Sequence, residues 1–458
     1  MARRPLALYP PDYHEVRGDQ HLLVWGILAR WLVVDEDLWR LLGRLNGRRR
    51  LDRALLQHAR AGGRPTAEVE AEARPLLAEL ERKGVLTRST RTPAPPTERL
   101  GVANVTLNLT NQCNLRCNFC YNPSGPGEEL AVDRLMDALE QGRGILDPEA
   151  SLILLGGEPT LRMDRLEGVL HRAEGLFKPL PMLSTNGTRL TQPNVERLAR
   201  HRLEVQVSLD SPRAAGHDAV RGNETFTRAV QGVERLVTAQ VPTILSMVFT
   251  SKTINDFEAY LDLAKDLGVR EARFIPMRLM GRGADMARDL PDLVQAFDTL
   301  LEVLQRRPEL RRLLVRDFFS ILQAVCGHAA ARPGCGVGAR VIFIDADGRV
   351  FPCPNHRQEQ LCLGSLADLD LERLVRGSEV LQEVRQAYQV DNYPGCSSCP
   401  FRYWCAGDCR GEALNITGDP FAPPPHCQEL RVLIPKMLWL MAEEQNEVAA
   451  SPGAVHLA

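Results

Sequence analysis

Cys113, Cys117 and Cys120 stand close together in the run CNLRCNFC, directly after an apolar segment at 105–109 that predicts a β-strand. Three thiolates on one short loop can face a single metal centre. A [4Fe–4S] cluster normally has four thiolate ligands, so three would leave one iron open to a ligand from outside the protein. A zinc knuckle is the alternative, but no further His or Cys follows within reach as the fourth ligand that zinc requires. The feature therefore predicts an iron–sulfur centre at the end of a strand.

The rest of the composition narrows the class of protein. The chain has 458 residues, which predicts two or three domains, and its net charge of −2 gives no reason to expect a nucleic-acid partner. Arg3 and Arg4 are not followed by an apolar run, and the longest apolar stretch, 22–34, is too short to span a bilayer. We therefore expect a cytoplasmic protein without a membrane partner, in which the 12 cysteines serve metal binding, redox chemistry or packing rather than disulfides.

Strand and helix patterns alternate over residues 100–325. The predicted strands are 105–109, 152–155, 181–184, 203–209, 243–249 and 272–276, and the predicted helices between them are 132–141, 163–175, 192–200, 226–239 and 257–267. Strands joined by helical crossovers run parallel. Six such units predict an α/β fold, a partial (β/α)6 barrel of the TIM type.

Two smaller units flank this barrel. Residues 1–86 predict a winged-helix-like domain: a hairpin of 22–26 with 30–35, then helices at 35–45, 51–59 and 66–83, the last kinked or split at Pro75. Residues 87–99 are a proline-rich linker. After a cysteine-rich region at 326–429, residues 430–444 predict an amphipathic helix that is kinked or starts afresh at Pro435, and residues 445–458 a disordered tail.

Short motifs follow the cysteines in a fixed order: GGEP at 156–159, STNG at 184–187, SLD at 208–210 and MRLMGRG at 277–283. Together with the C-x3-C-x2-C spacing and the aromatic Phe119, they resemble the radical S-adenosylmethionine (SAM) superfamily over residues 101–285. Each motif alone is weak, since a GG turn after a strand is common. Their order behind the cysteine triad gives the resemblance its weight.

The resemblance implies both the cofactors and the residues that hold them. Cys113, Cys117 and Cys120 would bind a [4Fe–4S] cluster, and SAM would bind its open iron and be cleaved to a 5′-deoxyadenosyl radical that abstracts hydrogen from a substrate. No general acid or base can be named. The residues implied to contact SAM are Phe119, Gly156, Gly157, Glu158, Pro159, Ser184, Asn186, Ser208, Asp210 and Arg221.

The later cysteines resemble the seven-cysteine SPASM domain that follows some radical SAM barrels. In that domain two auxiliary [4Fe–4S] clusters are held, and the pattern assigns Cys335, Cys353 and Cys409 to cluster I, and Cys396, Cys399, Cys405 and Cys427 to cluster II. A hairpin turn at Gly348 would bring Cys335 and Cys353 together on adjacent strands. A zinc ribbon is the alternative for the C-x2-C-x5-C-x3-C part.

Two cysteines remain after this assignment. Cys326 is the available upstream candidate for the fourth ligand of cluster I; without it, that cluster would keep an open iron. Cys362 is left over and reads as a small buried hydrophobic residue.

Residues 17–86 resemble the small precursor-binding domain called the RiPP recognition element, a relative of the peptide chaperone of pyrroloquinoline quinone biosynthesis. The resemblance rests on the hairpin, on WRLLGRLNG at 39–47 and on LERKGVL at 80–86. It implies a precursor peptide whose leader is added as a strand to a sheet edge. A winged-helix domain with a structural or dimerising role is the alternative.

Three functions follow. The first is a peptide maturase that introduces a cross-link, an epimer or another oxidised residue, with a flavodoxin or ferredoxin as the electron donor that the family implies. The second keeps the chemistry on another substrate, as in sulfatase maturases and tetrapyrrole-modifying enzymes. The third is a non-catalytic iron–sulfur carrier or scaffold, which the incomplete cysteine triad disfavours. The bond formed, the precursor and the oligomeric state stay open.

Overall fold

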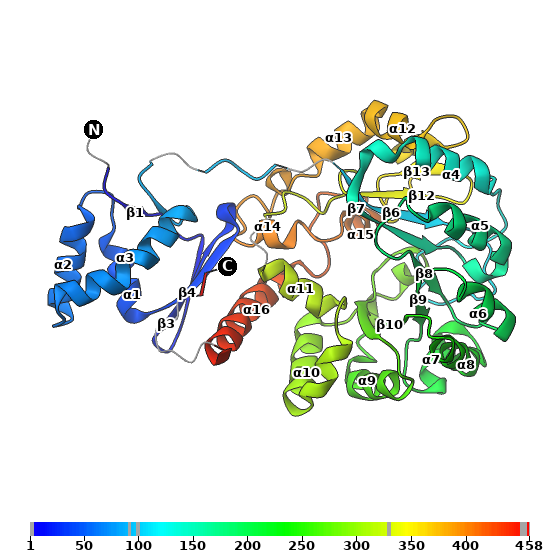
Figure 1. Cartoon of the computed structure of the whole chain (residues 1–458), viewed down its shortest axis with the longest axis horizontal. Coiled ribbons are helices and arrows are strands. Elements are labelled where there is room, and N and C mark those ends of the chain that lie inside the picture. The colour runs from blue at the N-terminus through cyan, green and yellow to red at the C-terminus, as the bar shows by residue number, and fades with distance from the viewer. Residues whose placement is uncertain (1–3, 90–92, 98–100, 328–330, 449–455, 458) are drawn as a thin grey trace.

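The computed structural model describes residues 4–89, 93–97, 101–327, 331–448 and 456–457. Within these residues the largest sheet has nine strands in the order β11-β10-β9-β8-β7-β6-β12-β13-β14 (Figure 1). Its strands are β6 (Val102–Asn108), β7 (Leu146–Leu155), β8 (Met182–Thr185), β9 (Glu204–Ser208), β10 (Thr243–Phe249), β11 (Glu271–Pro276), β12 (Val341–Ile344), β13 (Arg349–Phe351) and β14 (Gly364–Ser365).

The six strands from β6 to β11 pair in parallel, each with its neighbour in sequence. They overlap the six predicted strands, because the side chains that face the covering helices are apolar, as at Leu152 and Leu154 of β7 and at Val205 and Val207 of β9. The predicted α/β fold with a partial barrel is confirmed. The cysteine-rich region extends this sheet, since β12 pairs in parallel with β6 and leads into β13 and β14.

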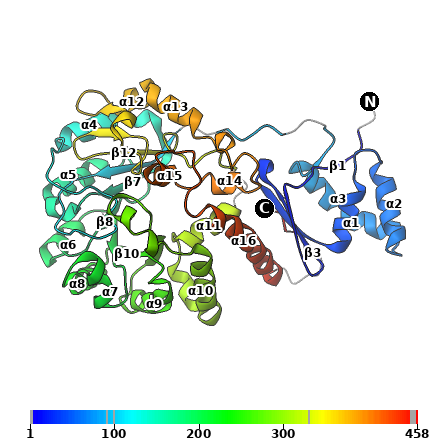
Figure 2. The ribbon, with the colours of Figure 1, turned by 180° about the vertical axis from the view of Figure 1, so that it is seen from behind.

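Helices cross over between the strands, as Figures 1 and 2 show. Those predicted from the sequence are α4 (Val132–Gln141), α5 (Met163–Ala173), α6 (Gln192–Leu198), α8 (Thr225–Thr238) and α9 (Phe257–Asp266). The sequence did not predict α7 (Ala214–Arg221), whose buried side chains include His217 and Arg221. Its inward face is polar, so no apolar periodicity marked it.

The N-terminal unit pairs a small sheet with three helices. The predicted hairpin is β3 (Gln20–Trp25) with β4 (Arg30–Asp35), and β2 (Tyr13–Arg17) adds a third strand that the sequence did not predict. The helices are α1 (Glu36–Arg44), α2 (Leu51–Ala61) and α3 (Thr66–Arg82). The last is a single helix through Pro75, so the predicted split does not occur.

Both faces of this small sheet are buried. Leu23 and Trp25 point to a core shared with the three helices of the unit. Leu22, Val24 and Trp31 belong to the large core of the barrel and the C-terminal helix. In Figure 1 this helix, α16 (Cys427–Val448), lies between the small blue sheet and the helices at the edge of the barrel.

The C-terminal end differs from the prediction in two ways. Helix α16 continues without interruption through Pro435, because Leu433, Ile434 and Leu438 anchor it in the large core. The tail predicted to be disordered is helical as far as Val448, and His456–Leu457 forms β15, which pairs antiparallel with β4. The remaining tail residues, 449–455 and 458, lie outside the described part. No helix among the described residues is long and apolar enough to cross a membrane.

Candidate active site

A cavity of about 370 Å³ opens at the carboxyl ends of the parallel strands, the place where α/β barrels carry their catalytic groups. Cys113, Cys117 and Cys120 all line it. The strand residues facing them include Ser184, Gln206, Ser208 and Ser246. The cysteine loop thus places three thiols in a cavity to which the strands contribute both polar side chains and apolar ones, such as Ile153, Met182 and Val248.

Two glycines allow the cysteine loop to lie close to the end of β7. A Cβ atom on Gly157 would lie 2.2 Å from the carbonyl oxygen of Gln112, and one on Gly156 would lie 2.7 Å from that of Thr110. The amide of Gly157 donates to this Thr110 oxygen at 2.7 Å. Any side chain at these positions would push the cysteine loop away from the sheet.

Cys113 and Cys117 are desolvated by burial. Burial raises the pKa of Cys113 to about 11 and also raises the pKa of Cys117. The guanidinium of Arg221 opposes the shift at Cys117, and its Nη1 lies 3.9 Å from the sulfur. When a metal centre binds such thiols, it displaces their protons.

Arg221 is held by a carboxylate behind the cavity wall. Asp210 is buried, ion-pairs with Arg221 and accepts a hydrogen bond from the amide of Val248 at 3.0 Å. The guanidinium carbon of Arg221 lies 5.5 Å from the centre of the Phe119 ring. Arg221 and Phe119 line the cavity, whereas Asp210 does not. Asp210 therefore positions the arginine.

Glu158, like Asp210, lies behind the cavity wall and holds other residues in position. It is fully buried; its Oε1 accepts from the hydroxyl of Thr185 at 2.7 Å, and its Oε2 from the amide of Asn186 at 2.7 Å. The carboxylate fixes the turn that follows β8, and neither it nor Pro159 lines the cavity. Seven of the ten expected SAM contacts do line it: Phe119, Gly156, Gly157, Ser184, Asn186, Ser208 and Arg221.

The sequence reasoning missed Asn355, which lines the same cavity. Its backbone amide donates to the sulfur of Cys353 at 3.2 Å, and its side-chain Nδ2 donates to the sulfur of Cys409 at 3.3 Å. The sequence signal was its place two residues after Cys353, a cysteine that the SPASM resemblance assigns to auxiliary cluster I. Asn355 connects the cavity to that group of thiols.

A partly buried ion-pair network makes a second connection. Arg278, in the loop after β11, lines the cavity, and its Nη1 lies 2.6 Å from Glu412 while its Nη2 lies 3.0 Å from Asp408. Glu412 also accepts from the amide of Leu279 at 2.8 Å. Both carboxylates flank Cys409, so the barrel loop and α15 (Arg410–Thr417) hold each other in place.

The remaining cysteines form two groups. Burial, followed by the charges of Cys335 and Cys409, raises the pKa of Cys353 well above its ordinary value, as expected for thiols that lie close together. Gly348 turns the chain between β12 and β13 with φ of +89°. A separate small cavity of about 20 Å³ is lined by the second group, Cys396, Cys399, Cys405 and Cys427.

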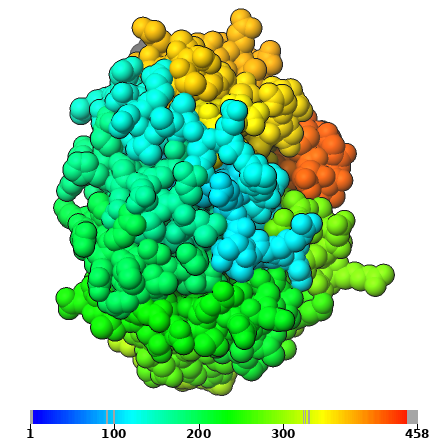
Figure 3. Space-filling view, turned by 90° about the vertical axis from the view of Figure 1, so that its right-hand side faces the viewer, coloured from blue at the N-terminus to red at the C-terminus, as the bar shows by residue number. Residues whose placement is uncertain are grey.

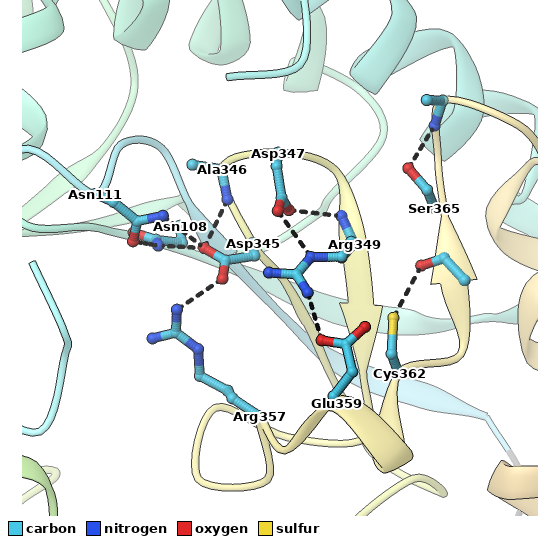
Figure 4. A network of polar contacts seen from close by, with 12 residues as sticks. Asn108, Asn111, Asp345, Ala346, Asp347, Arg349, Arg357, Glu359, Cys362 and Ser365 are labelled. Atoms are coloured by element: carbon cyan, nitrogen blue, oxygen red, sulfur yellow. Dashed lines mark hydrogen bonds and ion pairs between the residues drawn. The ribbon is translucent and has the colours of Figure 1, made fainter. Parts of the chain in front are cut away.

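Cys326 and Cys362 lie apart from both groups. The carbonyl oxygen of Cys326 accepts a hydrogen bond from Trp31, and burial raises the pKa of its thiol to about 12 without a contribution from another described cysteine. Cys362 lies beside β14, where its sulfur is 3.7 Å from the carbonyl oxygen of Gly364 (Figure 4). The structure does not bring Cys326 to Cys335, Cys353 and Cys409.

Within the described residues, no three His, Cys, Asp or Glu side chains converge on a point that could hold one metal ion. The ligands of a [4Fe–4S] cluster bind different iron atoms, so they need not converge in this way. Three thiols on one cavity wall, with an arginine beside them, fit a cluster with one open iron. Cys396, Cys399, Cys405 and Cys427 likewise surround one small volume.

Comparisons with known proteins agree with this geometry. The family model of the radical SAM superfamily matches residues 107–264, and that of the iron–sulfur cluster-binding SPASM domain matches residues 335–400. Mycofactocin maturase MftC of Mycolicibacterium smegmatis is 31% identical over 338 residues, covering 71% of this chain and 82% of the relative. An AdoMet-dependent heme synthase of Methanosarcina barkeri is 27% identical, covering 70% of this chain and 94% of the relative.

A solved structure extends the likeness in fold. Streptococcus suis SuiB, bound to its precursor peptide SuiA, superposes with a TM-score of 0.59 and 14% identity. The superposition covers 91% of this chain and 100% of SuiB. It therefore reaches beyond the barrel and the SPASM domain.

Proposed function

The chain belongs to the radical SAM superfamily and carries a SPASM domain, and from this premise we propose that it is a maturase of a ribosomally made precursor peptide. As a member it is an enzyme that binds SAM and a [4Fe–4S] cluster in its barrel and auxiliary iron–sulfur clusters in its SPASM domain. Reduction of the barrel cluster with SAM bound supplies a 5′-deoxyadenosyl radical for hydrogen abstraction. The non-catalytic carrier considered from the sequence is thereby set aside.

The cofactor ligands in this proposal follow the observed groups of thiols. Cys113, Cys117 and Cys120 hold the barrel cluster, and the seven cavity-lining residues named above hold SAM, with Arg221 fixed by Asp210. One auxiliary cluster is held by Cys335, Cys353 and Cys409, and the other by Cys396, Cys399, Cys405 and Cys427. Asp210, Glu158 and Pro159 act from behind the cavity wall as positioning residues.

A peptide substrate is supported by one observation above others, the strand order β15-β4-β3-β2 of the N-terminal sheet. Among the described residues, the outer edge of β4 pairs with the two residues of β15, at Leu32 and Val33. An edge that accepts one extended segment can accept another, and strand addition to an exposed edge is a common mode of peptide capture. We propose that the N-terminal domain, residues 1–86, binds the leader of the precursor along β4.

The names of relatives support the same substrate class. MftC is named a maturase, and SuiB was solved with a precursor peptide. The heme synthase among the relatives favours a tetrapyrrole substrate as the second candidate. The N-terminal sheet has no evident use on a tetrapyrrole, so we place the peptide first. A flavodoxin or ferredoxin is the electron donor in either case.

The test is anaerobic co-expression with the short open reading frame nearest to the gene, followed by high-resolution mass spectrometry of the peptide. The control carries Cys113→Ala, Cys117→Ala and Cys120→Ala together. Loss of paired hydrogens, or a solvent deuterium label in the case of epimerisation, is expected only with the intact cysteines. SAM cleavage without any change in the peptide would overturn the peptide assignment and favour the second candidate.

A further inference from the structure

A second cavity, of about 460 Å³, adjoins the one that holds the three thiols. We refer to it as the vestibule. The two share five wall residues, Cys120, Tyr121, Met280, Arg282 and Asn355. In Figure 3 the cyan surface that contains the cysteine loop meets the yellow and orange C-terminal region and the green segments of the barrel. A molecule in the vestibule therefore lies next to the catalytic cavity.

The wall of the vestibule is cationic. Arg116, Arg282 and Arg357 line it, and none of the described Asp or Glu residues does. The charge of Arg357 is balanced by Asp345, at 2.6 Å, in the network drawn in Figure 4. Arg282 donates from Nε to the neutral carbonyl of Cys117 at 2.8 Å, and Arg116 is exposed. Neither of these two forms an ion pair with a described residue, so their charge is available to a ligand.

A buried donor without a partner points to the same place. Asn122 lines the vestibule with only 3% of its surface exposed. Its Oδ1 accepts from Arg357 Nη1 at 2.7 Å, and since a guanidinium can only donate, the amide orientation is fixed. The Nδ2 group has no hydrogen-bond partner. Buried N–H groups of this kind are normally paired, so this donor is available to an acceptor in the vestibule.

Gln358 adds a hydrogen-bond acceptor to these donors. It lines the same wall, and its buried Oε1 has no hydrogen-bond partner either. A carboxylate accepts from guanidinium and amide N–H groups, while an adjoining peptide N–H can donate to a carbonyl oxygen. The wall therefore offers donors for a carboxylate beside an acceptor for a peptide amide.

We propose that the vestibule binds a carboxylate of the peptide substrate, through Arg116, Arg282 and Asn122. This inference deepens the proposed function and rests on the substrate being a peptide. The carboxylate belongs either to an acidic side chain or to the peptide C-terminus. Because the vestibule shares Cys120 and Asn355 with the catalytic cavity, binding there places the neighbouring residues of the peptide at the reaction site.

The test uses the anaerobically reconstituted enzyme with SAM and four short probes, so that no precursor is needed. N-acetyl-Ala-Ala-Glu amide is compared with its Gln counterpart, and N-acetyl-trialanine with its C-terminal amide. Affinities are measured by saturation-transfer NMR titration at low salt. We expect one or both carboxylate probes to bind at least about fivefold more tightly than the matched neutral probe, as charge-assisted hydrogen bonds predict.

Variants of the vestibule wall test whether the preference for the carboxylate probes arises there. Arg116→Gln should bring the affinity ratio close to one, and the near-isosteric Asn122→Asp should lower it by adding a repelling charge. Arg143→Gln is the matched control, because Arg143 is exposed and lines neither cavity. Iron content, measured for each variant, checks that the clusters are retained.

The outcomes distinguish an acidic side chain from the peptide C-terminus as the source of the carboxylate. They also test the carboxylate site separately from the proposed precursor-peptide function. A preference confined to the Glu probe identifies a side chain, and one confined to trialanine identifies the C-terminus. Equal binding of all four probes, or a preference that survives Arg116→Gln and Asn122→Asp, would overturn the inference. If co-expression leaves the peptide unmodified while the probes show the preference, the precursor assignment fails and the carboxylate site stands.

Discussion

Trp31 donates a hydrogen bond from its indole Nε1 to the main-chain oxygen of Cys326, with 3.0 Å between the two atoms, and both residues are almost fully buried. The bond joins β4 of the N-terminal sheet to α11 (Phe318–Gly327), next to the barrel. It gives Cys326 a place in the packing between the N-terminal unit and the rest of the chain. The peptide-binding edge proposed for β4 is thereby fixed relative to the catalytic cavity.

Replacing Trp31 with Phe should loosen this junction. The ring volume is largely kept but the hydrogen bond is lost, so the free energy of unfolding should fall by about 1 kcal/mol or somewhat more. Anaerobic denaturant unfolding followed by circular dichroism measures the change. Trp39→Phe is the control, because Trp39 is only partly buried. Equal stability of the Trp31→Phe and wild-type proteins would contradict the importance of the bond.

Cys326→Ala should leave the iron content unchanged, because the thiol lies apart from both groups of cysteines. Cys409→Ala should lose about four iron atoms per chain, the content of one cluster. Cys362→Ala serves as a second control and should also retain all iron. Iron and sulfide analysis of the reconstituted proteins gives the answer. Loss of iron from Cys326→Ala would assign this residue to auxiliary cluster I.

Asn355→Ala should lower the reduction potential of auxiliary cluster I. The side chain donates to the sulfur of Cys409, and such hydrogen bonds favour the reduced, more negative cluster. The expected shift is on the order of tens of millivolts, measured by redox titration with electron paramagnetic resonance. Asn415→Ala is the matched control, because its Nδ2 donates to the carbonyl of Leu279 and to no thiol. An unchanged potential would remove Asn355 from this role.

His217 should make the fold sensitive to acid. Burial lowers its pKa to about 4, and its Nδ1 accepts from the amide of Asp210 at 3.1 Å, so the folded state holds the neutral ring. The unfolded chain binds the proton at the ordinary pKa of about 6.5. The contribution of the neutral ring to the free energy of unfolding is therefore complete above that pH and is lost as the pH falls towards 4.

Between about pH 7.5 and about pH 5.5 the loss should be about 1 kcal/mol in the free energy of unfolding. His217→Asn keeps an acceptor at the same place without a titrating ring, and should remove this part of the pH dependence. Denaturant unfolding at the two pH values compares the proteins. The same slope in His217→Asn and wild type would show that other groups are responsible.

Removing residues 449–458 should strengthen leader binding. The pairing of β15 with β4 at Leu32 and Val33 occupies part of the edge proposed for the leader, and the shortened chain no longer competes for it. Isothermal titration of the identified precursor compares the two chains, and iron content checks that the clusters are intact. Unchanged affinity would mean that the leader binds elsewhere or that β15 does not compete.

The sequence by itself determined the positions of the parallel strands and the cysteine triad. The strand residues that face the covering helices are apolar, so each strand carries its own local signal, and the triad lies within one loop. The GG turn at 156–157 was also readable, although the reason for it was not. Only the structure shows that a side chain there would collide with the cysteine loop.

The supporting contacts were decided by tertiary structure alone. The contact of Asn355 with Cys409, the pairing of Arg278 with Glu412 and the bond between Trp31 and Cys326 each join residues far apart in the chain. The continuity of α16 through Pro435 depends likewise on its burial against the barrel. Local patterns carry no record of such partners, because a polar side chain finds its hydrogen bonds only after the apolar surfaces have packed.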